Sequence, residues 1–161
     1  MVSQVLSLGI SSIPPSCDWD HLRALTQPIA EEILLGKAIA VSGGSYKKGV
    51  GSAAWLLQGH SGKGRICNTI SVPGSVDIQS SFRSKLAGKY ATIFSVSRIC
   101  QLHNILAGSI ELGCNGVLAL WAIQLDVTLN FNHSNYDLLA TIKGMLLTSP
   151  ILWSFHHIVE H

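Results

Sequence analysis

The spacing of apolar and polar positions changes along this 161-residue chain, and each spacing predicts a different element. A short apolar run from Ala38 to Val41 predicts a strand, and a nearly continuous one from Ser52 to Gln58 predicts a second. The segment from Arg65 to Val72 alternates between polar and apolar residues, as a strand with one buried face does. The glycine-rich string GHSGKG before it is typical of a hairpin turn. Three sequential antiparallel strands are therefore expected over residues 37–73.

Helical and extended segments follow in alternation. Apolar residues at helical spacing predict a long helix that ends near His103. Ser109 to Cys114 alternates and predicts a fourth strand, and Val117 to Leu125 predicts a short apolar helix. The spaced apolar residues of the long helix are Phe82, Leu86, Tyr90, Ile93 and Phe94.

One more helix and one more strand complete the pattern. Ser134 and Asp137 resemble a capping box, which would open a helix that runs to Leu147. Pro150 stops that helix, and Ile151 to Ile158 predicts a fifth strand. The order β-β-β-α-β-α-α-β implies a mixed sheet, with the last two strands parallel to the first because helices connect them.

The first 36 residues form a lead-in in which prolines interrupt the pattern. A short helix is expected from Ile29 to Leu35, after Pro28, and Gly36 would end it.

Composition and charge narrow the classes of function. Apolar residues make up 47% of the chain and charged residues only 12%, which is low for a typical domain and predicts heavily buried strands or a partner surface. The net charge of +2 is much weaker than that of a dedicated nucleic-acid binder. The N-terminus lacks the features of a signal peptide, and no apolar stretch is long enough to span a bilayer. The four dispersed cysteines, Cys17, Cys67, Cys100 and Cys114, are expected as free buried thiols, which indicates an intracellular protein, cytoplasmic or nuclear.

Two motifs resemble known sites without meeting their requirements. The segment from Gly43 to Gly51 is rich in glycine and lysine, but it lacks the Lys-Ser/Thr that follows the last glycine of a phosphate-binding loop. A hairpin whose turn is Ser42–Ser45 is the expected structure there. The terminal His157-x-x-Glu160-His161 matches an inverted zinc-peptidase pattern, which needs a helix where this segment predicts a strand.

Other catalytic arrangements are missing from the sequence. No G-x-S-x-G string occurs, and the nine acidic residues are scattered over different predicted elements. Glu111, for example, alternates away from the core of the fourth strand.

Four strings in this order of elements resemble the ribonuclease H family, and most closely the ribonuclease H domains that follow reverse transcriptases in retroelements. They are AVSGGS, SSFRSKLAG, IELGCNG and FHHIVEH, at the first strand, first long helix, fourth strand and fifth strand. The resemblance covers roughly residues 37–161 and implies an α/β ribonuclease H-like fold, a five-stranded mixed sheet flanked by helices. Residues 1–36 would then be the tail of a preceding polymerase or connection region, and residues 37–161 a ribonuclease H-like domain truncated at its C-terminus.

The resemblance fails at the acids that carry the family's chemistry. In the family, these acids hold two divalent ions, Mg²⁺ or Mn²⁺, for hydrolysis of the RNA strand of an RNA–DNA hybrid. The first aspartate falls at Gly43, the helix glutamate at Lys85 and the strand-four aspartate at Asn115. The late Gly-His falls at Glu160 and His161, and the final aspartate would lie beyond the chain. The flanking residues that match the family are Gly44, Ser45, Arg83, Leu86, Cys114 and Gly116.

These substitutions predict that no metal cofactor binds. Mg²⁺ prefers anionic oxygen ligands, whereas Gly43 has no side chain and Asn115 is neutral. Lys85 would repel a nearby divalent ion by on the order of several kcal/mol. Lys85 and Lys89 are also a like-charged i,i+4 pair, which mildly disfavours the helix.

Nucleic-acid contacts remain open at several positions. Lys47 and Lys48 are either solubilising residues of a hairpin tip or contacts to backbone phosphates. The resemblance adds Gly44, Ser45, Ser80 and Ser81 as positions where the family touches the hybrid. The aromatic residues are expected in the core rather than as stacking platforms, namely Trp55, Tyr90, Trp121 and Trp153.

Three functional hypotheses follow. The first is a degenerate ribonuclease H-like domain of retroelement origin, a pseudoenzyme of a hydrolase family with at most weak binding to an RNA–DNA hybrid or other nucleic acid. The second is a structural or protein-interaction remnant without a nucleic-acid role, which the apolar composition and weak charge favour. The third, and least favoured, is an active hydrolase.

Overall fold

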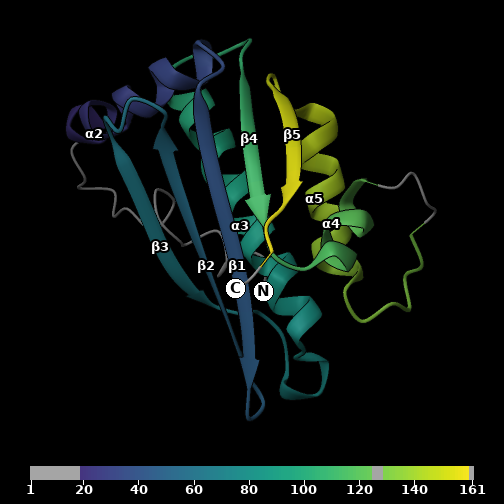
Figure 1. Cartoon of the computed structure of the whole chain (residues 1–161). Coiled ribbons are helices and arrows are strands. Elements are labelled where there is room, and N and C mark those ends of the chain that lie inside the picture. Colours follow the sequence, from purple (N-terminus) through teal and green to yellow (C-terminus); the bar gives the residue numbers. More distant parts are fainter. Residues whose placement is uncertain (1–18, 125–128, 160–161) are drawn as a thin grey trace.

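The computed structural model describes residues 19–124 and 129–159, which form one mixed five-stranded sheet with helices packed against it. The strand order is β3-β2-β1-β4-β5, and α2, α3 and α5 lie behind the sheet in the view of Figure 1. The strands are β1 (Ala38–Lys47), β2 (Val50–Gly59), β3 (Arg65–Ser71), β4 (Ser109–Cys114) and β5 (Leu152–His157). The helices are α2 (Trp19–Leu34), α3 (Ser81–Leu102), α4 (Val117–Gln124) and α5 (Tyr136–Thr148), with a short 3-10 helix η2 (Val76–Ile78).

The central strand β1 has different neighbours along its length. It pairs antiparallel with β2 throughout, but parallel with β4 only from Ala38 to Ser42. β2 continues antiparallel to β3, and β4 pairs parallel with β5. The predicted order of elements and the parallel placement of the last two strands are therefore confirmed. Because β4 ends beside Ser42, the second half of β1 extends past it together with β2 (Figure 1).

The turn expected over residues 42–45 is wrong, because this stretch continues β1 as far as Lys47. The chain reverses instead at Lys48 and Gly49, whose φ angles are 52° and 81°. Positive φ at both central residues is typical of a two-residue hairpin turn, since it matches the twist of the paired strands. Neither glycine of the 42–45 stretch has a positive φ.

Gly44 of β1 and Gly88 of α3 permit a close contact between the strand and the helix. A Cβ on Gly44 would overlap the backbone of Ser84, and a Cβ on Gly88 would lie 2.7 Å from the backbone oxygen of Gly43. Side chains at either position would force the two backbones apart. The helix therefore crosses β1 at a separation that only glycine permits.

The N-terminal helix is longer than predicted, because α2 runs through Pro28 instead of starting after it. Proline removes one helical hydrogen bond, but Leu22, Ile29 and Ile33 all bury their side chains in the same hydrophobic cluster as the sheet. This burial outweighs the local cost of the proline. Gly36, with a φ of 69°, follows the helix end as predicted.

Arg83 connects the start of α3 with the start of α5. Its guanidinium is fully buried and makes a bidentate pair with the Asp137 carboxylate, at 2.8 and 2.6 Å. It also donates to the backbone oxygens of Pro73 at 2.8 Å and Ser134 at 3.2 Å. The hydrogen bonds from Arg83 lower the pKa of Asp137 below its usual value. The predicted capping box is therefore wrong: Asn135 is the N-cap of α5 and makes no side-chain cap bond, and Asp137 pairs with Arg83 instead.

The expected aromatic core is confirmed only in part. Trp55 and Tyr90 are buried and Trp153 is half-buried, but Trp121 is 53% exposed. Trp121 lies on the short helix α4, whose buried residues occupy the other face. An apolar helix of this length does not reveal from sequence which of its faces is covered.

The expected free thiols are confirmed for the cysteines in the described residues, where no disulfide occurs. Cys100 and Cys114 are buried as expected, but Cys67 is exposed because it lies on the open side of β3. Cys17 lies outside the described residues. No helix in the described ranges is long and apolar enough to cross a membrane.

The close contact of α3 with β1 can be tested with two matched Gly→Ala variants. Gly88→Ala should lower the free energy of unfolding by about 1–3 kcal/mol, because its methyl group meets the β1 backbone. Gly144→Ala in α5 meets no atom within 4 Å and should raise it by about 0.5–1 kcal/mol through helix propensity. Urea unfolding measures both values. Equal stabilisation by the two variants would contradict the close contact.

Candidate functional site

The three positions that the resemblance aligns with the family's acids lie close together where β1 passes the end of β4. A Cβ on Gly43 would be 3.8 Å from Oδ1 of Asn115, an ordinary contact distance. A Cβ on Gly116 would overlap the side chain of Lys85 and lie 3.4 Å from its Nζ. Gly43, Asn115 and Lys85, which come from β1, the β4–α4 turn and α3, therefore border one small region.

A second lysine, Lys89, lies in the same region and is completely buried. Its Nζ is 3.5 Å from the backbone oxygens of both Lys85 and Asn115, which is the outer limit of a hydrogen bond. Burial lowers the pKa of Lys89 below its usual value, the neighbouring Cys114 thiol acts against this shift, and the positive charge of Lys85 adds to it. The site thus holds two lysines and no paired carboxylate among the described residues.

Sequence reasoning treated Lys89 only as a neighbour of Lys85 and missed its burial. The signal was present, because Lys89 continues the stripe of apolar α3 residues formed by Leu86, Ile93 and Val96. The amine of a lysine in such a stripe either extends to solvent or is buried with the apolar residues. Because α3 packs closely against β1, the Lys89 amine does not reach solvent.

The predicted nucleic-acid positions fall into two groups. Lys47 and Lys48 are exposed at the β1–β2 tip, and the hydroxyl oxygens of Ser45 and Ser52 lie 2.9 Å apart on the same hairpin. Ser80, in contrast, is the N-cap of α3, since its side chain accepts from the backbone N–H of Arg83 at 3.0 Å. Ser81 is exposed in the first turn of that helix, and Gly44 contacts the backbone of α3.

A hollow of about 320 Å³ opens beside the hairpin and the β4–α4 turn. The described residues of its lining offer hydroxyl and backbone groups but no charged side chain. The lining residues are Gly43, Gly44, Ser45, Ser52, Ala53, Ala54, Thr69 and Asn115.

Solved structures share this arrangement of strands and helices at low sequence identity. Ribonuclease H1 from the halophilic archaeon Halobacterium salinarum has a TM-score of 0.51 and 14% identity, over 76% of this chain and 86% of that one. LC11-RNase H1, isolated from compost by a metagenomic approach, has a TM-score of 0.52 and 15% identity, over 76% and 84%. The chain has a ribonuclease H-like fold. No protein-family model matches the sequence, and a comparison with curated proteins finds no match.

The residues of this ribonuclease H-like fold do not fit the two-metal site that the resemblance implies. The described residues contain no group of three histidine, cysteine or acidic side chains placed to hold a metal ion. Around these positions, Gly43 offers no side-chain ligand and Asn115 offers an amide, while Lys85 and Lys89 bring positive charge. The nearest acid on β4, Glu111, is exposed and lies 3.7 Å from Nε2 of His156, another exposed residue.

Only part of the C-terminal histidine motif lies within the described residues. His157 ends strand β5, in agreement with the predicted strand, whereas Glu160 and His161 lie outside the described residues. The role of His161 as the family's late histidine stays a prediction.

The burial of Lys89 predicts a pH-dependent change in stability on replacement by Met. At neutral pH, Lys89→Met should raise the free energy of unfolding by about 1–4 kcal/mol, because it removes a buried charge that has no carboxylate partner. The unfolded chain keeps its Lys89 proton up to about pH 10.5, whereas the folded chain loses it at lower pH. The wild type is therefore stabilised as pH rises through this window, and the advantage of Lys89→Met should shrink.

Chemical denaturation at several pH values up to 10 measures this difference. Lys63→Met, in the exposed β2–β3 loop, is the control for the change in net charge. A Lys89→Met advantage that stays constant with pH would show that Lys89 is not desolvated.

Proposed function

We propose that this chain is a ribonuclease H-like domain of retroelement origin that does not cleave RNA, and that it retains at most weak binding to an RNA–DNA hybrid or other nucleic acid. Two observations support the lack of hydrolysis. The ammonium groups of Lys85 and the buried Lys89 lie in the region that Gly43 and Asn115 border. Among the described residues, no carboxylate pairs with Lys89. The retroelement origin rests on the resemblance of the four sequence strings.

Electrostatics explains why these residues oppose the family's chemistry. A lysine ammonium 4 Å from a cation costs about 4 kcal/mol per unit charge of that cation at an effective dielectric constant of 20. Two such lysines border the site, and a divalent ion would meet both. Without carboxylates to offset this repulsion, the site would not compensate a divalent ion for the free energy that it costs to release its water ligands.

The β1–β2 hairpin supports the proposed residual binding. Lys47 and Lys48 project at its tip, beyond the end of β4, and Ser45 adds a hydroxyl on the way to the site. These groups suit phosphate contacts, which depend on charge and carry no base specificity.

A second candidate function is that of a protein-interaction module without a nucleic-acid role. The sheet face opposite the helices carries exposed apolar side chains, including Val41 on β1 and Leu152 on β5, which are 40% and 77% exposed. Together with the net charge of only +2, this surface suits a protein partner better than a polyanion.

Restoring the acids tests the assignment of the site. The triple variant Gly43→Asp, Lys85→Glu and Asn115→Asp should bind Mn²⁺ weakly, and adding Lys89→Met should tighten binding at least tenfold by removing the buried charge. Gly43 can accept the aspartate, because a Cβ there would make only ordinary van der Waals contacts with the Asn115 side chain. Isothermal titration calorimetry with Mn²⁺ measures both, with Lys89→Met alone as the control. A folded quadruple variant without ion binding would refute the assignment.

Binding to an RNA–DNA hybrid distinguishes the two candidate functions. Fluorescence anisotropy at increasing salt should give a weak affinity that falls steeply, and Lys47→Gln should reduce the salt slope by about 1. Lys63→Gln, at the opposite end of β2, should leave the slope unchanged. Absence of binding at low salt would favour the protein-interaction function, and Mg²⁺-dependent cleavage by the wild type would overturn the proposed inactivity.

A further inference from the structure

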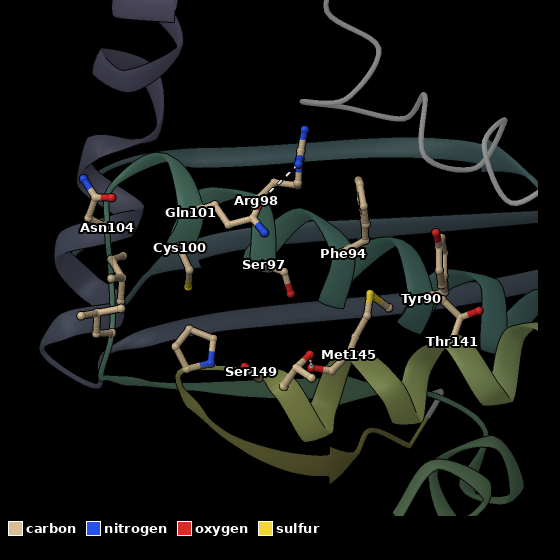
Figure 2. Close-up of a pocket in the computed structure, with 14 residues that line it drawn as sticks. Tyr90, Phe94, Ser97, Arg98, Cys100, Gln101, Asn104, Thr141, Met145 and Ser149 are labelled. Atoms are coloured by element: carbon tan, nitrogen blue, oxygen red, sulfur yellow. Dashed lines mark hydrogen bonds between the residues drawn. The ribbon is translucent and has the colours of Figure 1, made fainter.

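A cavity of about 680 Å³ lies between α3 and α5, and none of its lining residues belongs to the candidate site (Figure 2). Its volume is within the range of about 300–1,000 Å³ typical of small-molecule pockets. Figure 2 shows the α3 residues Tyr90, Phe94 and Arg98 along one wall and the α5 residues Thr141 and Met145 along the other.

The walls of this cavity are more apolar than their composition suggests. The hydroxyls of Ser97, Thr141 and Thr148 donate to the backbone carbonyls four residues earlier in their own helices, at 2.8, 2.7 and 3.0 Å. These hydroxyls therefore have their donors satisfied and need no polar ligand. The apolar lining side chains are Phe94, Ile105, Leu106, Met145 and Pro150.

Tyr90 is the polar exception at one end of the α3 wall. It is 1% exposed, and its hydroxyl has no hydrogen-bond partner among the described residues. Burial raises the pKa of Tyr90 to about 12, so the hydroxyl is neutral and carries a proton to donate at physiological pH. A buried unpaired hydroxyl costs free energy that an oxygen atom of a ligand would recover.

Among the described residues that line the cavity, Arg98 alone carries a charge. Its guanidinium lies 5.8 Å from the centre of the Phe94 ring and donates to Oε1 of Gln101 at 3.1 Å. One N–H of the guanidinium is used in the bond to Gln101, and a guanidinium has five N–H donors in a planar fork that suits one carboxylate. Arg98 is eight residues from Tyr90, which is about 12 Å along a helix at 1.5 Å per residue.

We propose that this cavity binds a medium-chain monocarboxylate that carries a hydroxyl or keto oxygen at its far end. The carboxylate pairs with Arg98, the alkyl chain lies between α3 and α5, and the distal oxygen accepts the Tyr90 hydrogen bond. A single cation in the lining matches a single anionic group. The proposal is independent of nucleic-acid binding, because it uses none of the residues of the candidate site.

Isothermal titration calorimetry on the full chain, without nucleic acid, tests this with three probes: ω-hydroxydecanoate, decanoate and decanol. ω-Hydroxydecanoate should bind about 3- to 10-fold more tightly than decanoate, which reflects one recovered hydrogen bond, and decanol should bind most weakly. Equal affinities for the three probes, or no saturable binding of ω-hydroxydecanoate, would overturn the proposal.

Two variants assign the ends of the ligand. Arg98→Gln should weaken both carboxylates about 10-fold or more and leave decanol unchanged. Tyr90→Phe should leave decanoate unchanged and remove the advantage of ω-hydroxydecanoate. Arg65→Gln, an exposed arginine on β3, is the matched control and should change nothing. Equal losses for Arg98→Gln and Arg65→Gln would show nonspecific attraction and would contradict the assignment.

Discussion

The contact between α3 and β1 is the constraint on which the rest of this structure depends. Gly44 and Gly88 face the opposing backbone at distances that no other residue allows, so the helix cannot move away from the sheet without losing its packing. The same turns of α3 carry Lys85 and Lys89. Their side chains are thereby fixed against the β4–α4 turn, and the character of the candidate site follows from this packing as much as from the residues themselves.

Different parts of helix α3 contact different neighbouring elements. Arg83 joins the helix start to α5 through the Asp137 pair, and it binds the carbonyl of Pro73 before the helix. Tyr90 and Phe94, with rings 6.1 Å apart, form the wall of the cavity that faces α5. A displacement of α3 would therefore disturb the candidate site, the α5 junction and the cavity together.

The sequence predicted those parts of the fold that depend on apolar spacing and missed those that depend on tertiary contacts. The bounds of β4 follow from simple alternation, and they agree with the structure. Glycine is common in turns, so Gly43 and Gly44 predict a turn, whereas the structure requires glycine at Gly44 because the backbone of α3, distant in sequence, lies against it. Asp137 resembled a cap, but its partner Arg83 comes from α3, and no local pattern reveals such a pair.

The sequence predicts where the candidate site lies, but it does not predict which charges are buried around it. The resemblance predicts that Gly43, Lys85 and Asn115 lie together, and in the structure they border one small region. The burial of Lys89 was missed, because it requires knowledge of how closely α3 approaches β1.

The two buried cations of α3 differ in how their charge is balanced. Arg83 is neutralised by the Asp137 carboxylate and by backbone oxygens, as buried charges usually are. Lys89 has only two backbone oxygens at 3.5 Å and the Cys114 thiol among the described residues. Its environment lacks negative charge on the side where Gly43 and Asn115 lie.

A carboxylate at position 43 or 115 would supply that missing charge. The desolvated Lys89 ammonium would compete for this charge with a divalent ion, because the ion must first lose its water. Carboxylates introduced at positions 43 and 115 would therefore be partly neutralised by Lys89, unless the lysine is removed as well. The absence of carboxylates at Gly43 and Asn115 and the burial of Lys89 therefore act on the same balance of charge.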